Sequence, residues 1–327
     1  ICSDAIKHIS VTTGCYDGNV VGVGSVYSPQ CTIIMDEVEE ITIGTPIGIY
    51  FGINGIWELK GIFFTNGEPE CEGGGMTVTA HGMIGQYGNV VFDYDDFYLL
   101  NRTTTIRDVL IYLQTIREIP FSFVVNNPSP NFGDWEITAP LRKRGEEGTE
   151  SENRITINEL LAGIAVMYGG NIVERDGSIY LTSQLDRAGI AEFDLGDCNS
   201  GFNYSKKKYG IRFLKASFLP TVVNRTVDDP EHPTEVIREY LVYSGTGRAS
   251  RAIYFIPSSE NDADIQYDQV IECDWIGNGM GFSGNIFLSG KVSYHTGNFE
   301  FSGYNKELRA GEKIRIKTQD EDDIIFI

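Results

Sequence analysis

Three stretches near the start of the chain alternate apolar and polar residues, which is the pattern of strands with one buried face. Asn54-Gly55 separates the first two stretches and is a strong signal for a tight hairpin turn. Closely spaced strands with glycine turns predict a barrel or sandwich over residues 1–90. The alternating apolar residues are Ile47, Ile49, Phe51 and Ile53, then Trp57, Leu59 and Phe63, then Met76, Val78 and Ala80.

The apolar period changes to three and four residues after Thr156, which predicts an amphipathic helix. Thr156 and Glu159 have the spacing of a capping box, in which each side chain binds a free backbone N–H of the other residue. Gly169 and Gly170 follow and predict the end of the helix. The apolar stripe consists of Ile157, Leu160, Leu161, Ile164 and Met167.

A β-hairpin is predicted directly after this helix. Residues 171–174 and 178–182 read as short strands, and Asp176-Gly177 between them is a strong turn signal. No side chain of the helix or hairpin is chemically reactive in this context. From the residues alone, the unit is interpreted as a structural core element.

A second capped helix is predicted at Thr105, with Asp108 at the capping position. T-I-R-D-V-L-I-Y-L at 105 aligns with T-I-N-E-L-L-A-G-I at 156, which is either a short internal repeat or a chance match. Two such helices, each with one apolar stripe, suit a small α/β domain over residues 91–195.

Residues 196–327 return to alternating patterns. Leu214, Ala216 and Phe218 alternate, and apolar pairs flank the turn H-T-G-N: Val292 with Tyr294, and Phe299 with Phe301. The run G-x-x-I-x-I occurs at Gly311 and also at Gly44. This repeated motif either arose by chance or reflects two related strand domains at opposite ends of the chain.

Composition excludes some classes of function. The chain of 327 residues has a formal net charge of −20, which argues against non-specific binding to nucleic acid. No apolar run is long enough to suggest a membrane span, and no secretory signal is evident. Six scattered cysteines without a C-x-x-C pair predict reduced thiols rather than a zinc site. They are Cys2, Cys15, Cys31, Cys71, Cys198 and Cys273.

A search for catalytic motifs finds none. The four histidines are far apart in the sequence, and neither H-E-x-x-H nor G-x-S-x-G occurs. G-M-G-F-S-G at 279–284 has the spacing of a dinucleotide motif, but no capped helix follows it. The sequence therefore predicts no catalytic, cofactor-binding or metal-binding residue. The histidines are His8, His81, His232 and His295.

Two acidic segments are weighed as cation sites and set aside. Asp262, Asp264, Gln266 and Asp268 resemble the start of a calcium loop. Tyr267 replaces the glycine at position six, and Cys273 replaces the glutamate at position twelve. The aspartates at 93, 95 and 96 are interpreted as a solvated acidic turn.

The helix followed by G-G and R-D-G-S-I-Y-L resembles the middle domain of prophage tail proteins of Gram-positive bacteria, which are similar to the baseplate hub of contractile tails and the type VI secretion spike. M-T-V-T-A-H-G-M at 76–83 resembles the strand that closes the first hub domain. Residues 303–316 fit a glycine-rich run of the last domain, except at Tyr304 and Asn305.

The resemblance implies a β-rich α+β fold, with two β-barrel-like domains (1–90 and 196–327) flanking a small α/β domain with two helices (91–195). It implies a structural, non-enzymatic hub subunit in the virion tail, assembled in the bacterial cytoplasm as a homotrimer. Its partners are the tail tube and a distal spike or lysin.

Two alternatives remain open: a cell-wall glycan hydrolase, which needs only two well-placed carboxylates, and a carbohydrate- or receptor-binding module. Exposed aromatic side chains favour the second alternative, and the candidates are Trp57, Trp135 and Trp275. Because Trp57 alternates with Leu59, we expect it to lie in the core; Trp135 is the best candidate for exposure.

Overall fold

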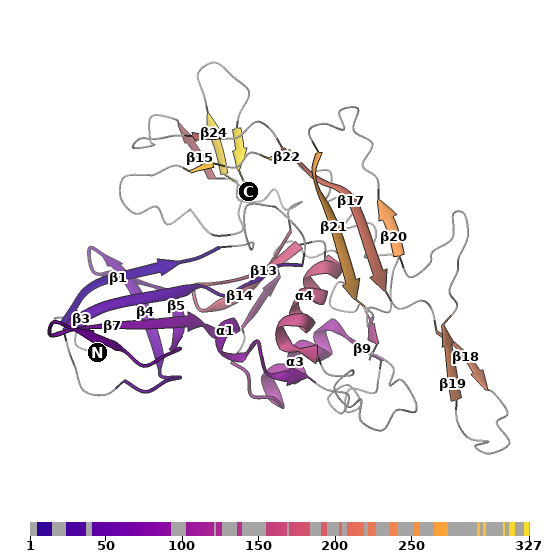
Figure 1. Cartoon of the computed structure of the whole chain (residues 1–327), viewed down its shortest axis with the longest axis horizontal. Coiled ribbons are helices and arrows are strands. Elements are labelled where there is room, and N and C mark those ends of the chain that lie inside the picture. The colour runs from indigo at the N-terminus through magenta and orange to yellow at the C-terminus, as the bar shows by residue number, and fades with distance from the viewer. Residues whose placement is uncertain are drawn as a thin grey trace.

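A computed structural model gives the fold (Figure 1), which is β-rich, with three helices among the described residues: α1 (Met83–Tyr87), α3 (Ile106–Thr115) and α4 (Ile157–Tyr168). The structure describes residues 5–14, 24–36, 41–92, 103–120, 122–125, 136–138, 155–168, 170–183, 191–194, 203–204, 208–218, 222–226, 236–240, 252–255, 265–273, 293–294, 297–298, 310, 314–317 and 324–326.

A six-stranded antiparallel sheet forms the N-terminal part of the chain, with the strand order β1-β3-β7-β5-β4 and β6 paired to β7. The three alternating stretches of the sequence are β4, β5 and β7. Among the described pairings, β1 and β4 are edge strands that do not pair with each other, so the sheet is not closed into a barrel. The strands are β1 (Ile6–Thr12), β3 (Gln30–Asp36), β4 (Pro46–Ile53), β5 (Ile56–Thr65), β6 (Glu70–Glu72) and β7 (Gly75–Gly82).

One face of this sheet carries a hydrophobic core, as the alternation predicted for β4, β5 and β7. Its buried members are Cys31, Ile33, Met35, Ile47, Ile49, Phe63, Met76, Val78 and Ala80.

The hairpin of β4 and β5 extends beyond this core. Asn54 and Gly55 have φ of 53° and 82°, so the predicted turn is confirmed. β5 pairs with β7 only from Phe63 to Thr65, and the rest of β5 pairs with β4 alone. The register shifts between Ile49 and Tyr50, where the buried part of β4 ends. The predicted core position of Trp57 is wrong: its side chain is 70% exposed, because the register shift places it on the face of Tyr50 and Gly52, opposite to the core residues Ile49 and Phe63.

The second sheet joins residues from distant parts of the sequence, in the order β10 (Phe123–Val125), β14 (Ser178–Ser183), β13 (Gly170–Arg175) and β2 (Val26–Tyr27). β2 lies parallel to β13, so the N-terminal segment contributes a strand to this sheet. Two short ribbons adjoin the helices: β8 (Val91–Phe92) with β12 (Ile155–Thr156), and β9 (Thr103–Thr105) with β11 (Glu136–Thr138).

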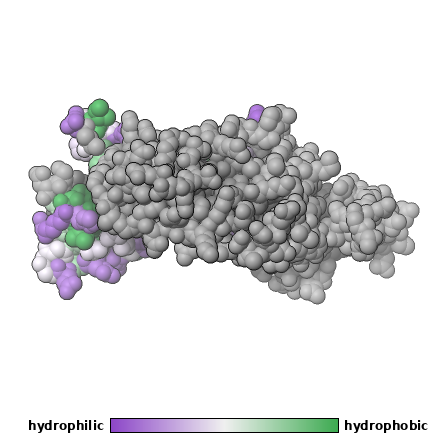
Figure 2. Space-filling model, turned by 90° about the horizontal axis from the view of Figure 1, so that it is seen from above, coloured by the Kyte–Doolittle hydropathy of each residue, from purple (hydrophilic) through white to green (hydrophobic). Residues whose placement is uncertain are grey.

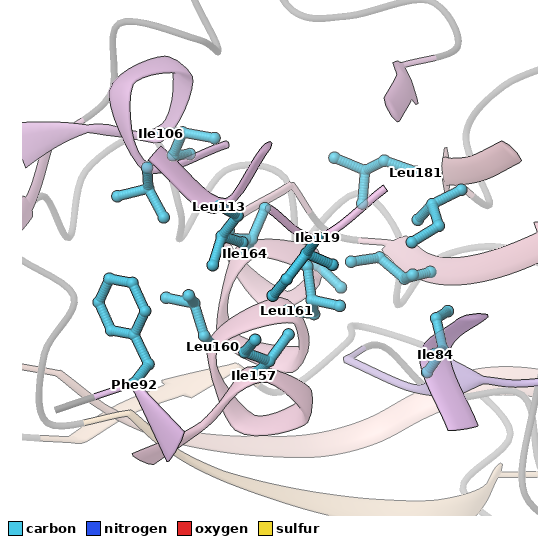
Figure 3. Close-up of a cluster of buried hydrophobic side chains, with 14 of the residues drawn as sticks. Ile84, Phe92, Ile106, Leu113, Ile119, Ile157, Leu160, Leu161, Ile164 and Leu181 are labelled. Carbon is cyan, nitrogen blue, oxygen red and sulfur yellow. The ribbon is translucent and has the colours of Figure 1, made fainter. Parts of the chain in front are cut away.

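Helices α3 and α4 pack into one core with this sheet, as Figure 3 shows. Both predicted caps are present: the Asp108 N–H donates to Thr105 Oγ1 at 3.2 Å, and the Glu159 N–H donates to Thr156 Oγ1 at 3.2 Å. Phe64, Met83 and Ile84 of the N-terminal part belong to the same core. The core is therefore shared by segments that the sequence assigned to separate domains.

The C-terminal strands pair in four groups among the described residues, and none of the groups is closed. Leu214, Ala216 and Phe218 lie on the longest strand, β17, as their alternation predicted. Ile314 and Ile316 lie on β24. The groups are β17 (Lys208–Phe218) with β20 (Ala252–Phe255), β21 (Ile265–Cys273) and β22 (Ser293–Tyr294); β15 (Ala191–Asp194) with β24 (Ile314–Lys317) and β25 (Ile324–Phe326); β16 (Asn203–Tyr204) with β23 (Gly297–Asn298); and β18 (Val222–Thr226) with β19 (Val236–Tyr240).

Several sequence predictions fall outside the described residues: the acidic turn at 93–96, Trp135 and Trp275, the glycine-rich segment 279–284, Gly311, and His232 and His295. Asp268 lies in strand β21.

Candidate functional site

The helix–hairpin unit formed by α4, β13 and β14 contacts more distant parts of the chain than its sequence suggests. Its own construction follows local signals: the Thr156 N–H donates to Glu159 Oε2 at 2.6 Å, which completes the capping box. Asp176 and Gly177 have φ of 50° and 73°, as a tight two-residue turn requires. The hairpin is therefore fixed locally, and its side chains are available for long-range contacts.

Glu174 of β13 caps the short helix α1, which lies 90 residues earlier in the chain. The Met83 N–H donates to Glu174 Oε1 at 2.7 Å, and the Ile84 N–H donates to Glu174 Oε2 at 2.9 Å. The residue at the N-cap of α1 is Gly82, which has no side chain to accept these bonds. Glu174, which lies on a strand of the second sheet, thus supplies the hydrogen-bond acceptor that Gly82 lacks.

Burial strongly affects this carboxyl group. Glu174 is only 1% exposed, and loss of hydration raises the pKa of its carboxyl from 4.5 to about 7, against the lowering effect of the hydrogen bonds from Ile84 and Met83. The group therefore titrates near neutral pH at the junction between the two sheets.

Three further contacts hold the hairpin against segments far away in sequence, and the first two involve Asn171 and Gly177. The Ser25 N–H donates to Asn171 Oδ1 at 2.9 Å beside the pairing of β2 with β13. Gly177 lies against the Leu59 side chain, where an added Cβ would be 2.8 Å from the nearest leucine carbon.

Arg175 makes the third contact. Its guanidinium lies 4.1 Å from the centroid of the Tyr180 ring, and its Nη1 donates to the Ala310 carbonyl at 2.9 Å. One hairpin thereby connects the first sheet, the helical core and a residue close to β24.

The described residues offer little reactive chemistry. No group of three His, Cys, Asp or Glu side chains that could hold a metal ion occurs among them. Cys31 and Cys71 are free thiols, and burial raises the pKa of Cys31 to about 11, which keeps it protonated at neutral pH. His81 Nε2 lies 3.2 Å from Gln86 Oε1, and His8 is exposed on β1. None of the helices that the structure describes has the length and apolar character of a membrane span.

Sequence reasoning found the hairpin but missed the role of Glu174. The local signal was weak: an acidic residue on a strand whose neighbours Ile172 and Val173 are apolar. All six residues of β13 are buried, which removes the alternation that would have indicated an inward-facing carboxylate.

The outer part of the β4–β5 hairpin is a second surface feature that the sequence misplaced. Four large apolar side chains are exposed there. They are Tyr50 (58% exposed), Phe51 (41%), Ile56 (71%) and Trp57 (70%). Figure 2 shows apolar patches (green) next to hydrophilic ones (purple) at one end of the molecule.

Comparisons with solved structures find phage tail proteins. The chain is similar to prophage tail protein gp18 from Listeria monocytogenes EGD-e, with 9% identity, a TM-score of 0.48, and coverage of 98% of this chain and 81% of that chain. It is similar to a 43 kDa tail protein of prophage MuSo2 from Shewanella oneidensis, with 13% identity, a TM-score of 0.45, and coverage of 96% and 89%.

A chain of the phage P2 baseplate in its activated conformation matches with 11% identity and a TM-score of 0.28, over 95% of this chain and 82% of that chain. No family model matches the sequence. No curated protein matches it either. Three structures of phage or prophage tails are thus similar to this chain over most of its length, at scores that do not establish a common fold.

Proposed function

We propose that this chain is a structural subunit of a phage or prophage tail, at the baseplate hub between the tail tube and a distal spike or lysin. The observation that carries the proposal is the helix–hairpin unit of residues 156–183, whose sequence resembles the middle domain of such proteins. In this structure the unit contacts β2, α1, β5 and Ala310, which suits a domain that organises its flanking domains.

The proposed domains are two β-rich units, 1–90 and 196–327, flanking the α/β unit 91–195. Three copies form a ring, so that two related domains per chain give six similar positions for contact with a sixfold tube. The net charge of −20 per chain supports an acidic bore that does not retain DNA, since retention requires basic groups.

Light scattering over a concentration series, with negative-stain images of the concentrated sample, tests the ring. We expect a mass three times that of the 36.4 kDa chain at high concentration. A twofold dimer with a large apolar interface would contradict the hub assignment.

A cell-wall glycan hydrolase is an alternative function. Incubation of the purified protein with labelled peptidoglycan separates it from the structural proposal, because release of soluble fragments requires catalysis. We expect no release.

A carbohydrate-binding module is the other alternative, and the exposure of Tyr50 and Trp57 favours it, since glycan sites present aromatic rings to solvent. Binding of the intact protein to cell-wall glycan, measured by sedimentation, tests it. Binding that is lost when Trp57 is replaced would support this alternative over the hub.

A further inference from the structure

The tip of the β4–β5 hairpin, residues 50–57 and here named the hairpin tip, is apolar on both of its faces. Gly52 pairs directly with Trp57, so Trp57 projects from the same face as Gly52 and Tyr50. Phe51 and Ile56 project from the opposite face. A two-stranded ribbon is only marginally stable in water, and exposing apolar side chains on both faces adds to this cost. The tip therefore has the character of an element that is covered when the protein is assembled.

The two exposed rings are held in place before any partner binds. The Trp57 indole covers Gly52, where an added Cβ would be 2.6 Å from ring carbons. The Tyr50 ring covers Gly48 in the same way, at 3.1 Å. Aromatic anchors that are already ordered lose little conformational freedom on docking, which is a feature of strong contact residues.

The charge around the tip suits a partner that is itself acidic. Residues 41–65 contain one acidic and one basic side chain, Glu58 and Lys60, which form an ion pair at 3.2 Å. Acidic segments flank this stretch in the sequence: D-E-V-E-E at 36–40 and E-P-E-C-E at 68–72. In a chain of net charge −20, a neutral apolar surface is where two copies can approach without strong repulsion.

We propose that the hairpin tip docks on a neighbouring copy of this chain and forms the contact between subunits; this inference rests on the ring proposed above. A glycan fits the tip less well, because the side chains of residues 50–57 offer sugar hydroxyl groups only the Asn54 amide, the Tyr50 hydroxyl and the Trp57 indole N–H, and none of these is charged. An apolar protein surface needs no such bonds and gains from covering both faces of the ribbon.

The test compares intact wild-type protein with Trp57→Ser and Ile56→Ser by light scattering over a concentration series. The matched control is Ile116→Ser, which removes an isoleucine that is 60% exposed outside the tip. We expect the tip variants to weaken association at least tenfold and the control to associate as the wild type does. Thermal unfolding of each variant checks that the monomer is folded.

A second variant separates the effect of the position of the Trp57 ring on association from the effect of its apolar area. Gly52→Ala keeps Trp57 but displaces its indole, so it should also weaken association, by a smaller factor than Trp57→Ser. Tip variants that form the same ring as the wild type would overturn this inference and leave the ring intact. A wild-type protein that stays monomeric at every concentration would overturn both. A change of tryptophan fluorescence on addition of soluble cell-wall glycan that is absent in Trp57→Ser, with no effect of the variants on association, would assign the tip to a glycan instead.

Discussion

The Glu174 carboxylate lies so close to the α-carbon of Gly82 that a side chain at position 82 has no room. The same carboxylate accepts hydrogen bonds from the next two backbone N–H groups, those of Met83 and Ile84. Gly82 and Glu174 thus form a single contact that joins β7 and α1 to the β13–β14 hairpin.

Glu174→Gln should change how stability depends on pH. The pKa of Glu174 in the folded protein is raised to about 7, so the folded state holds a proton between pH 4.5 and 7 that the unfolded chain releases. The raised pKa contributes on the order of 3 kcal/mol to the free energy of unfolding below pH 4.5. This contribution is lost as the pH rises through 7. Urea unfolding between pH 5.5 and 8 should show a smaller loss of stability with rising pH for Glu174→Gln than for the wild type.

Glu70→Gln is the control for this experiment, because Glu70 is an exposed carboxylate on β6. Its unfolding free energy should follow the wild-type curve. Parallel curves for the wild type and Glu174→Gln would mean that Glu174 does not titrate in this range.

Gly82→Ala should destabilise the protein by about 2–4 kcal/mol, because the added methyl group displaces a carboxylate that satisfies two buried N–H groups. In a Glu174→Ala background the methyl group has space, so the same substitution should cost much less. A double-mutant cycle from urea unfolding measures this coupling. Additive effects would show that the two residues do not share a contact.

Gly177→Ala should destabilise the protein by about 1–3 kcal/mol. Its φ of 73° disfavours any side chain, and an added Cβ would press on Leu59 at 2.8 Å. Gly74→Ala is the matched control, since its φ is 79° and nothing lies within 4 Å of its added Cβ. Thermal unfolding of both variants is the measurement, and an equal Tm for the two would contradict the packing of the turn on β5.

Cys71 should react with a thiol reagent in the native protein at pH 8, whereas Cys31 should react only after unfolding. Cys71 is exposed, while Cys31 is buried and burial raises its pKa to about 11. Reaction kinetics of Cys71→Ser and Cys31→Ser identify the two thiols. In the denatured, unreduced protein all six cysteines should react; far fewer would indicate disulfides.

Replacing either helix cap should cost about 1 kcal/mol. Thr156→Ala and Thr105→Ala each remove the hydroxyl that accepts the N–H three residues later. Urea unfolding gives the two free energies, and similar values are expected because each hydroxyl accepts the N–H three residues later at 3.2 Å. A cost near zero for both would mean that packing alone fixes the ends of α3 and α4.

The local elements were predictable because their signals lie within a few residues of one another. The caps at Thr105 and Thr156, the turns at Asn54-Gly55 and Asp176-Gly177, and the alternation in β7 and in the first part of β4 appear in the structure. Each depends on backbone groups that a neighbouring residue can satisfy or on a conformation that glycine permits.

Alternation failed for Trp57 because a bulge in β5 changes which face its residues occupy. Ile49 pairs with Gly61 but Tyr50 pairs with Leu59, so Lys60 is an extra residue in β5. Trp57 therefore lies on the face of Tyr50 and Gly52, opposite to the core residues Ile49 and Phe63. The exposure of Trp57 depends on this bulge, which the alternation around it does not reveal.

The sequence by itself determined helices α3 and α4, the β4–β5 and β13–β14 hairpins and the excess of acidic charge, since these follow from local geometry and composition; it did not indicate the short helix α1. Only the tertiary structure decided that β2 joins β13, that Glu174 caps α1, and that Phe64 and Met83 share a core with α3 and α4. The physical reason is that these contacts pair groups more than 20 residues apart. Their free energy comes from burial and from hydrogen bonds that exist only once both partners have been brought together.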